Sequence, residues 1–330
     1  MNTKTLLDEY GEYLKKEKQP EWITPMLATL TDDYFDDIAW IYERKLDGER
    51  CLAFKKEDEV KLYSRNKKLL NNTYPKVVNA LKGEQGEFIV DGEVVAFEGE
   101  LTSFSKLQKR MHKREQDNIE KTGIDVYFYL FDIMHLNGYN TEEMQLVHRK
   151  KVLKSLIEFS DTIRFVKHRR EKGIEYHDEA CDKGWEGIIA KDSTSKYVHS
   201  RSRKWLKFKC RNQQEFVIGG YTEPQGEREY FGALLIGYYQ GDDFVYAGKV
   251  GTGYTEETLE TLGEKLREIE TEENPFEGMI DDKGVHWVEP KLVCEVKFTE
   301  WTDYDKLRHP SYLGLRRDKS PREIKREIPA

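Results

Sequence analysis

The sequence predicts an α+β protein with a mixed domain of strands and helices at residues 1–212 and a small β-barrel domain at residues 213–330. Two observations support this. Up to residue 212, runs of β-branched and aromatic residues alternate with segments of helical spacing. After "CRNQQ", short glycine-punctuated strands follow one another, and several such strands in about 115 residues fit an OB-fold, although another small barrel also fits.

The first domain is expected to contain both helices and strands. Residues 4–18 predict a short charged helix, and residues 141–158 predict a second helix that opens on a threonine followed by acids. The strands are expected in "FIVDGEVVAF" (88–97), "VYFYLFDIMHL" (126–136), "WEGIIAK" and "KWLKFK". This mixture indicates antiparallel sheets combined with helices.

The second domain is expected to be mostly strand. Its four predicted strands are "EFVIGGYTE", "GALLIGYYQ", "DFVYAGKVG" and "KLVCEVKFTEW", with one helical insert at residues 255–270. Neither an internal repeat nor a low-complexity tract interrupts the pattern.

Composition excludes several protein classes. Hydrophobic residues make up 38% and charged residues 35% of the chain, as in soluble globular proteins. No apolar run is long enough to span a bilayer, and the charged N-terminus lacks an export signal. We therefore expect a cytoplasmic protein without a membrane partner. Because Cys51, Cys181, Cys210 and Cys294 form no C-x-x-C pair, we expect free thiols rather than a disulfide framework or a zinc site.

Positive charge is clustered although the net charge is −8. Residues 191–211 hold eight Lys or Arg and one acid, and residues 306–326 hold eight more against two acids. A third basic cluster, "KLQKRMHKR", covers residues 106–114. Any one of these runs is usually a solvated surface, but their segregation from the acids favours a phosphate-bearing ligand.

The stretch "ERKLDGER" (43–50) places Lys45, Asp47, Gly48 and Arg50 between two apolar segments. A charged hairpin turn is the simplest interpretation. The pattern is nevertheless followed, in order, by "SRN" (64–66), "DGEVV" (91–95), "YLFDIM" (129–134), "EGIIAK" (186–191), "KWLKFK" (204–209) and "GLRRDK" (314–319).

This ordered set resembles the covalent nucleotidyltransferase superfamily, which includes ATP-dependent DNA ligases, RNA ligases and mRNA capping enzymes. The resemblance extends from about residue 22 to the end, and the wording is most similar to bacterial ATP-dependent DNA ligases of the ligase D and ligase C type. It implies a nucleotidyltransferase (adenylation) domain followed by an OB-fold domain.

The resemblance also implies a nucleophile and its activating groups. Lys45 would attack ATP and carry AMP covalently, which requires a neutral amine. We expect Lys207, Lys209 and a divalent metal to lower the pKa of Lys45 and to stabilise the α-phosphate. Lys207 and Lys209 lie two residues apart, on the strand face that also carries Trp205, with Phe208 on the other face. Taken alone, this stripe fits a half-buried strand with a solvated basic side.

Further residues match positions that contact the nucleotide or a metal ion in the superfamily. Carboxylates suited to Mg²⁺ or Mn²⁺ are Glu93 and Glu186. The resemblance assigns nucleotide contacts to Glu43, Arg44, Arg50, Arg65, Glu93 and Phe131, and assigns Arg316 and Lys319 to the closing motif of the barrel domain. Periodicity alone leaves Phe131 equally compatible with an ordinary core position, and Asp91 compatible with a turn.

These expectations define an ATP-dependent DNA ligase that seals nicks carrying a 3′-hydroxyl and a 5′-phosphate. The alternatives are an RNA ligase, a capping-type guanylyltransferase, or a non-catalytic nucleic-acid-binding protein built on the OB-fold. An NAD⁺-dependent ligase is disfavoured because only 44 residues precede Lys45 and no four-cysteine zinc cluster follows.

The expected substrate is nicked double-stranded DNA, bound by a monomer associated with the nucleoid. We expect none of the additional DNA-binding, polymerase and nuclease modules of larger ligases in this chain. A bacterial Ku protein or a separately encoded repair polymerase is therefore an expected partner in break joining.

Overall fold

The protein is described by a computed structural model that covers residues 3–111, 123–224, 226, 228–280, 282 and 284–329. These residues form two compact units, one made of the chain up to Cys210 together with Ile328 and Pro329, and the other spanning Arg211–Glu327. The predicted domain boundary lies two residues further along the chain. Each unit is described separately.

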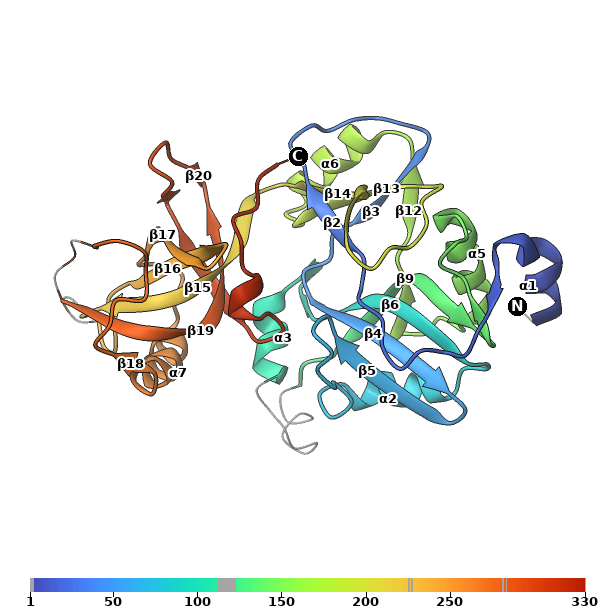
Figure 1. Ribbon diagram of the computed structural model, residues 1–330, viewed down its shortest axis with the longest axis horizontal. Helices are drawn as coiled ribbons and strands as arrows, with labels where there is room; N and C mark the ends of the chain where they lie inside the picture. The colour runs from blue at the N-terminus through green and yellow to red at the C-terminus, as the bar shows by residue number, and fades with distance from the viewer. Residues whose placement is uncertain are drawn as a thin grey trace. The chain divides into compact units, whose positions relative to one another are not determined.

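The first unit contains two large sheets, a small two-stranded sheet and helices (Figure 1). The seven-stranded sheet runs in the order β1 (Lys15–Lys16), β10 (Tyr139–Asn140), β9 (Tyr127–Leu136), β6 (Phe88–Val95), β4 (Glu49–Lys56) and β5 (Glu59–Ser64), with β11 (Ile163–Phe165) parallel to β9. The five-stranded sheet runs β12 (His168–Arg170), β3 (Trp40–Arg44), β13 (Gly187–Asp192), β14 (Arg201–Lys209) and β2 (Leu27–Leu30). The small sheet pairs β7 (Phe97–Glu98) with β8 (Leu101–Thr102).

The helices of this unit are α1 (Thr3–Tyr10), the 3₁₀ turn η1 (Gly11–Tyr13), α2 (Pro75–Lys82), α3 (Phe104–Met111), α5 (Leu146–Leu156) and α6 (Gly173–Asp182). The strands predicted at residues 88–97, 126–136, "WEGIIAK" and "KWLKFK" are confirmed. The helix predicted over 4–18 is too long, since it ends at Tyr10. The helix predicted over 141–158 begins five residues late because the Thr141 hydroxyl, instead of capping a helix, donates to the carbonyl of Ile133, 2.8 Å away.

Apolar clusters on each side of the sheets organise the first unit in layers. Trp205, Phe131, Leu52 and Ile89 belong to one buried cluster, which joins β14 of one sheet to β9, β4 and β6 of the other. The outer face of the seven-stranded sheet packs on α2, and the outer face of the five-stranded sheet packs on α6 (Figure 1). Residues of the inner faces therefore meet between the two sheets.

The second unit is an antiparallel sheet with one helix, as predicted. The strand order is β17 (Asp243–Val250), β16 (Leu234–Gln240), β15 (Asn212–Thr222), β19 (Val285–Phe298) and β18 (Glu270–Thr271), with β22 (Ser311–Arg316) also paired to β19. A hairpin of β20 (Glu300–Trp301) and β21 (Leu307–Arg308), the helix α7 (Glu256–Arg267) and the 3₁₀ turn η2 (Pro321–Glu323) complete it. Thr255 caps α7, because its hydroxyl accepts the Thr258 N–H.

The cysteines differ in part from the prediction of four free thiols. Cys51 and Cys294 are free and buried, as predicted. Cys181 and Cys210 instead form a disulfide. The sequence conceals this pair because 29 residues separate its members, and only the packing of α6 against the end of β14 brings them together.

Candidate active site

Lys45 is the first residue after β3 and lies where the two sheets meet. Its backbone N–H donates to the carbonyl of Gly187, 3.0 Å away, which ties the 45–48 loop to the start of β13. Gly48 follows in that loop, and a Cβ atom there would lie 2.3 Å from the carbonyl oxygen of Val94. Only glycine fits, so the loop packs closely against β6 and holds Lys45 in place.

The Lys45 ammonium contacts the carboxylate of Glu186, and both side chains are largely buried. Burial alone would lower the pKa of Lys45, but the charges of Glu186, Glu93 and Asp47 outweigh burial and raise it. The protein's own side chains therefore favour the charged amine, and a lowering of this pKa by Lys207, Lys209 and a divalent metal together stays a prediction. The reason is that the group nearest the Lys45 amine is a carboxylate, not Lys207 or Lys209.

Arg50, on β4, is held by a carboxylate from the neighbouring strand β6. Its guanidinium makes two bonds to Asp91, at 2.5 and 2.6 Å, and a third to the carbonyl of Met26 at 3.2 Å. Asp91 is fully buried and also accepts the Tyr197 hydroxyl at 2.7 Å. Asp91 thus positions Arg50 rather than closing a turn. The sequence did not indicate this pairing, because the "DG" dipeptide at residues 91–92 suggests only a turn.

The Phe131 ring, on β9, lies under two cations. The Arg50 guanidinium carbon is 4.5 Å and the Lys191 Nζ 4.3 Å from the ring centroid, and Trp205 meets the ring edge-on. Phe131 is 7% exposed, so it is both a core residue and a wall of this cationic site.

Glu43 lies at the base of the site, 2% exposed, and pairs with the ammonium groups of Lys150 and Lys191. Burial alone would raise the pKa of Glu43, but the two lysines outweigh burial and lower it, so the carboxylate is charged. Burial also lowers the pKa of Lys191 to about 8. Sequence reasoning missed both lysines, although Lys191 ends the quoted "EGIIAK".

Lys207 and Lys209 are half-buried and alternate on β14 with Leu206 and Phe208. Trp205 belongs to the cluster between the sheets, whereas Leu206 and Phe208 belong to the cluster under α6. The predicted division of this strand into two faces is therefore confirmed. Lys207 and Lys209 share the face of Trp205, which is the face toward the site.

The remaining predicted residues of the first unit are Glu93, Arg44 and Arg65. Glu93, half-buried on β6, is paired in register with Arg50 and acts on the charges of Lys45 and Arg50. The Arg44 guanidinium stacks on the Trp185 ring at 4.3 Å. Arg65, partly exposed, directly follows β5. Two carboxylates that both act on Lys45 form a donor set suited to Mg²⁺, which prefers one or two carboxylates plus phosphate and water oxygens.

Arg316 and Lys319 belong to the second unit, where each is engaged in ion pairs. Arg316 is bound by Asp318 at 2.8 Å and Glu295 at 3.1 Å, and its side chain is 8% exposed. Lys319 pairs with Glu215 at 3.2 Å. The predicted contact of these cations with a nucleotide thus requires exchange of protein carboxylates for phosphate.

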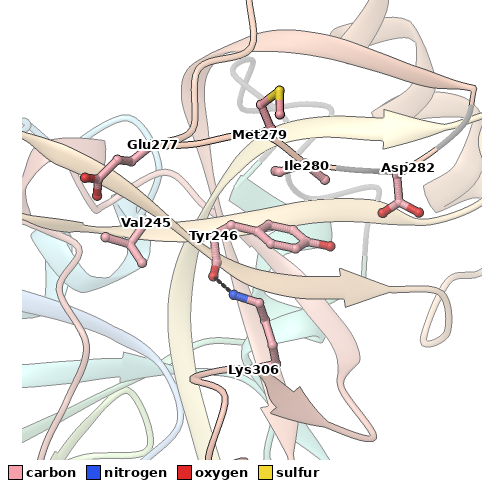
Figure 2. Close-up of a pocket in the computed structure, with 7 residues that line it drawn as sticks. All are labelled: Val245, Tyr246, Glu277, Met279, Ile280, Asp282 and Lys306. Carbon is pink, nitrogen blue, oxygen red and sulfur yellow. Dashed lines mark hydrogen bonds between the residues drawn. The ribbon is translucent and has the colours of Figure 1, made fainter.

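The second unit also carries a pocket of about 380 Å³ (Figure 2). Its lining includes Lys306, whose ammonium donates to the carbonyl of Tyr246 at 2.7 Å, and Asp282, which pairs with Lys249. None of the residues predicted from the motifs lines this pocket.

Comparison with known proteins identifies the family. The model of the ATP-dependent DNA ligase domain matches residues 25–209, and the model of the ATP-dependent DNA ligase C-terminal region matches residues 227–319. The chain belongs to the ATP-dependent DNA ligase family. The predicted family and the predicted fold, a nucleotidyltransferase domain followed by an OB-fold domain, are thereby confirmed.

Relatives of this ligase include longer proteins. It is 34% identical to the multifunctional non-homologous end joining protein LigD of Pseudomonas aeruginosa, over 100% of this chain and 41% of that protein. It is 30% identical to a DNA ligase of Methanococcus aeolicus, over 92% of this chain and 56% of that protein. The chain thus spans between two fifths and three fifths of the length of these relatives.

The solved structure of a mycobacterial DNA ligase D complexed with ATP and MES is 32% identical to this ligase. The match has a TM-score of 0.66 and covers 92% of this chain and 98% of that one. Within the described residues, no helix is both long and apolar enough to cross a membrane.

Proposed function

We propose that this ligase seals DNA nicks by way of a lysyl-AMP intermediate on Lys45. The observation that carries the proposal is the Lys45–Glu186 contact beside a fixed Arg50, in a chain matched by both DNA ligase models. The comparisons favour this function over RNA ligation, guanylyl transfer and non-catalytic nucleic-acid binding.

The proposed reaction has three steps. The neutral Lys45 amine attacks the α-phosphorus of ATP, so that an N–P bond forms and the bond to pyrophosphate breaks. An oxygen of the nick 5′-phosphate then takes AMP from Lys45, which regains its free amine. Finally the 3′-hydroxyl attacks the 5′-phosphate, loses its proton to solvent, and releases AMP.

The protein's own residues prepare the first step. Glu186 holds the Lys45 amine in place, and Arg50, Lys207 and Lys209 offer positive charge to the phosphates. Glu43, Arg44, Arg65, Glu93 and Phe131 are proposed to contact the nucleotide. Glu93 and Glu186 would hold Mg²⁺ or Mn²⁺, which supplies Lewis-acid stabilisation of the phosphates.

The test of this proposal is covalent labelling with ATP radiolabelled at the α-phosphate. Wild type should become labelled, whereas Lys45→Ala should not; Lys154→Ala, which removes an exposed lysine of α5, serves as the matched control. Label on the Lys45→Ala protein would refute the assignment, and preferential labelling by GTP would favour a guanylyltransferase.

Metal dependence tests the proposed ion site at Glu93 and Glu186 independently of Lys45. Excess EDTA should abolish labelling, and added Mg²⁺ or Mn²⁺ should restore it. Undiminished labelling in EDTA would argue against a metal site at Glu93 and Glu186.

We further propose that the enzyme acts as a monomer on nicked duplex DNA at the nucleoid, and that a Ku protein or repair polymerase delivers broken ends. The support is the similarity to end-joining LigD proteins. Ligation of a singly nicked duplex should need no partner, while joining of linear ends should increase when a bacterial Ku protein is added. Equal end joining with and without Ku would exclude this partnership.

A further inference from the structure

Three potential metal ligands converge on the side of the five-stranded sheet away from the active site. His177 and Cys181 lie one turn apart on α6, and Cys210 directly follows β14. Their ligand atoms all lie within 4.8 Å of one another. Residues spaced i, i+4 share one face of a helix, as in known helical zinc motifs.

The separation of His177 from Cys181 suits a tetrahedral ion, and reduction would let the two sulfur atoms of the disulfide move apart to bind it. His177 Nε2 lies 3.5 Å from Cys181 Sγ. In a zinc site with Zn–N of about 2.0–2.1 Å and Zn–S of about 2.3 Å, tetrahedral geometry separates the nitrogen and sulfur ligands by about 3.5 Å. Because zinc binds thiolates, the site is available only when the Cys181–Cys210 disulfide is reduced.

The surroundings hold the histidine in an orientation that suits metal binding. The His177 side chain is 9% exposed and packs on the rings of Tyr34 and Phe208. Its other ring nitrogen, Nδ1, is buried without a hydrogen-bond partner, and the nearest carboxylate oxygen, on Asp178, is 3.7 Å away. A zinc-bound histidine commonly directs its second N–H to a carboxylate, which fixes the ring, and Asp178 is the candidate for that role here.

The redox setting favours a metal over a permanent disulfide. Members of a DNA ligase family act on DNA, in compartments where thiols are kept reduced, and in such proteins grouped cysteines more often bind metal or act in catalysis. This step rests on family membership alone and not on the proposed role of Lys45.

We propose that His177, Cys181 and reduced Cys210 form a zinc site, with water as the fourth ligand, that is separate from the magnesium site at Glu186. Binding would release the two thiol protons to solvent. The ion would connect α6 to Cys210, which directly follows Lys209 at the end of β14. The Cys210 N–H donates to the carbonyl of Glu186 at 3.1 Å, so the same chain segment supports Glu186.

Cobalt titration of the full chain tests the site. The protein is reduced with a phosphine, freed of metal, and titrated with Co²⁺ alone, without ATP or DNA. We expect one equivalent to bind, with a thiolate-to-cobalt charge-transfer band and the visible bands of tetrahedral cobalt, and Zn²⁺ to displace it. Cys181→Ser and Cys210→Ser should each weaken zinc binding by at least about 100-fold. Cys294→Ala, which alters a free cysteine of the other unit, should bind like wild type.

Oxidation provides a test without mutation. Treating the zinc-loaded wild type with diamide should release the ion, because the two thiolates lose two electrons to form the disulfide and the hydrazine product takes two protons from solvent. The proposal is overturned if the reduced wild type gives no cobalt bands, if the bands persist in Cys181→Ser, or if diamide leaves zinc bound. None of these outcomes depends on ligase activity, so a failure here is distinguishable from a failure of the proposed function.

Discussion

At the scale of single residues, the proposed nucleophile, Lys45, lies against the carboxylate of Glu186. The contact with Glu186 positions the Lys45 amine but also stabilises its protonated form, which cannot attack phosphorus. Any cation that neutralises Glu186 therefore favours the reactive, neutral amine. The proposed divalent metal would in this way be linked to the protonation state of Lys45.

The pH dependence of self-adenylylation tests this link. Glu186→Gln removes the first charge that raises the pKa of Lys45, so burial lowers that pKa and the amine becomes neutral at lower pH. We expect the rise of the single-turnover rate with pH to move about 1 to 3 units lower, while the plateau rate falls. Glu179→Gln, which changes an acid of α6 that pairs with Arg169 and Lys183, is the control and should keep the wild-type profile. An unchanged profile in Glu186→Gln would contradict the link.

The Arg50–Asp91 pair is expected to stabilise the fold as well as the site. Asp91→Asn leaves the Arg50 guanidinium without its buried counter-charge, so the free energy of unfolding should fall by about 3 kcal/mol. Denaturant unfolding measures this loss. Asp125→Asn breaks only the exposed pair with Lys76 and should change the same quantity by less than about 1 kcal/mol. Equal effects of the two variants would show that Arg50 is held by its other contacts.

At the scale of secondary structure elements, the turn into β13 determines where Glu186 lies. Gly187 has a φ of +140°, and a Cβ atom there would lie 2.0 Å from the carbonyl oxygen of Phe208 on β14. Strands β13 and β14 can therefore pair in this register only when residue 187 is glycine. The turn also brings the Glu186 carbonyl to the Cys210 N–H, so the segments that carry Glu186 and Cys210 share one junction.

Gly187→Ala should consequently destabilise the first unit. Backbone strain and the clash with β14 together predict a loss of about 3 kcal/mol in the free energy of unfolding. Gly11→Ala is the matched control, since its Cβ would meet nothing within 4 Å and its effect should stay within about 1 kcal/mol. A tolerated Gly187→Ala substitution, with normal unfolding and activity, would show that the junction can relax.

At the scale of the whole molecule, the closing motif belongs to a different unit from Lys45. Arg316 is buried between Asp318 and Glu295, so its removal is expected to destabilise the barrel and obscure any catalytic effect. Lys319, which pairs with Glu215 at 3.2 Å, is the sharper probe of a role in the first step.

Lys319→Ala should separate the steps of the reaction. Pyrophosphate leaves only in self-adenylylation, so that step should slow by about 100-fold, while sealing of a pre-adenylylated nick changes by less than about threefold. Single-turnover kinetics of both steps measure the difference, and Lys325→Ala, an exposed lysine of the same tail, is the control. Equal losses in both steps would argue against a specific role of Lys319 in self-adenylylation.

We expect DNA affinity to depend on only some of the Lys and Arg residues in the basic clusters. In the cluster at 191–211, Lys191 is buried against Glu43, Lys204 pairs with Asp192, and Lys196 pairs with Glu143. Part of the cluster at 106–114 lies outside the described residues. Acids near these lysines reduce the number of charges available to phosphates.

Salt dependence measures how many cations remain in use. Binding to a nicked duplex should weaken steeply as salt rises, and Arg203→Ala, which removes an exposed arginine of β14, should reduce the slope of the log–log plot by about 1. Lys154→Ala on α5 should leave the slope unchanged. A flat salt response in the wild type would show that the clusters are only solvated surface.

The sequence by itself determined the family, the longer central strands of both units and the candidate nucleophile, because these depend on local patterns and on the order of the motifs. The spacing of Trp205, Lys207 and Lys209, two residues apart, predicts that they share one face of a strand. The order of the motifs predicts which residues share a site. Only the tertiary structure decided what those residues contact. The structure pairs Arg50 with Asp91, Glu43 with Lys150, and Cys181 with Cys210, and each pair joins segments far apart in the chain. The raised pKa of Lys45 likewise depends on the distant Glu186. Charge and coordination act through space over a few ångströms, and sequence spacing does not encode those distances until the sheets have packed.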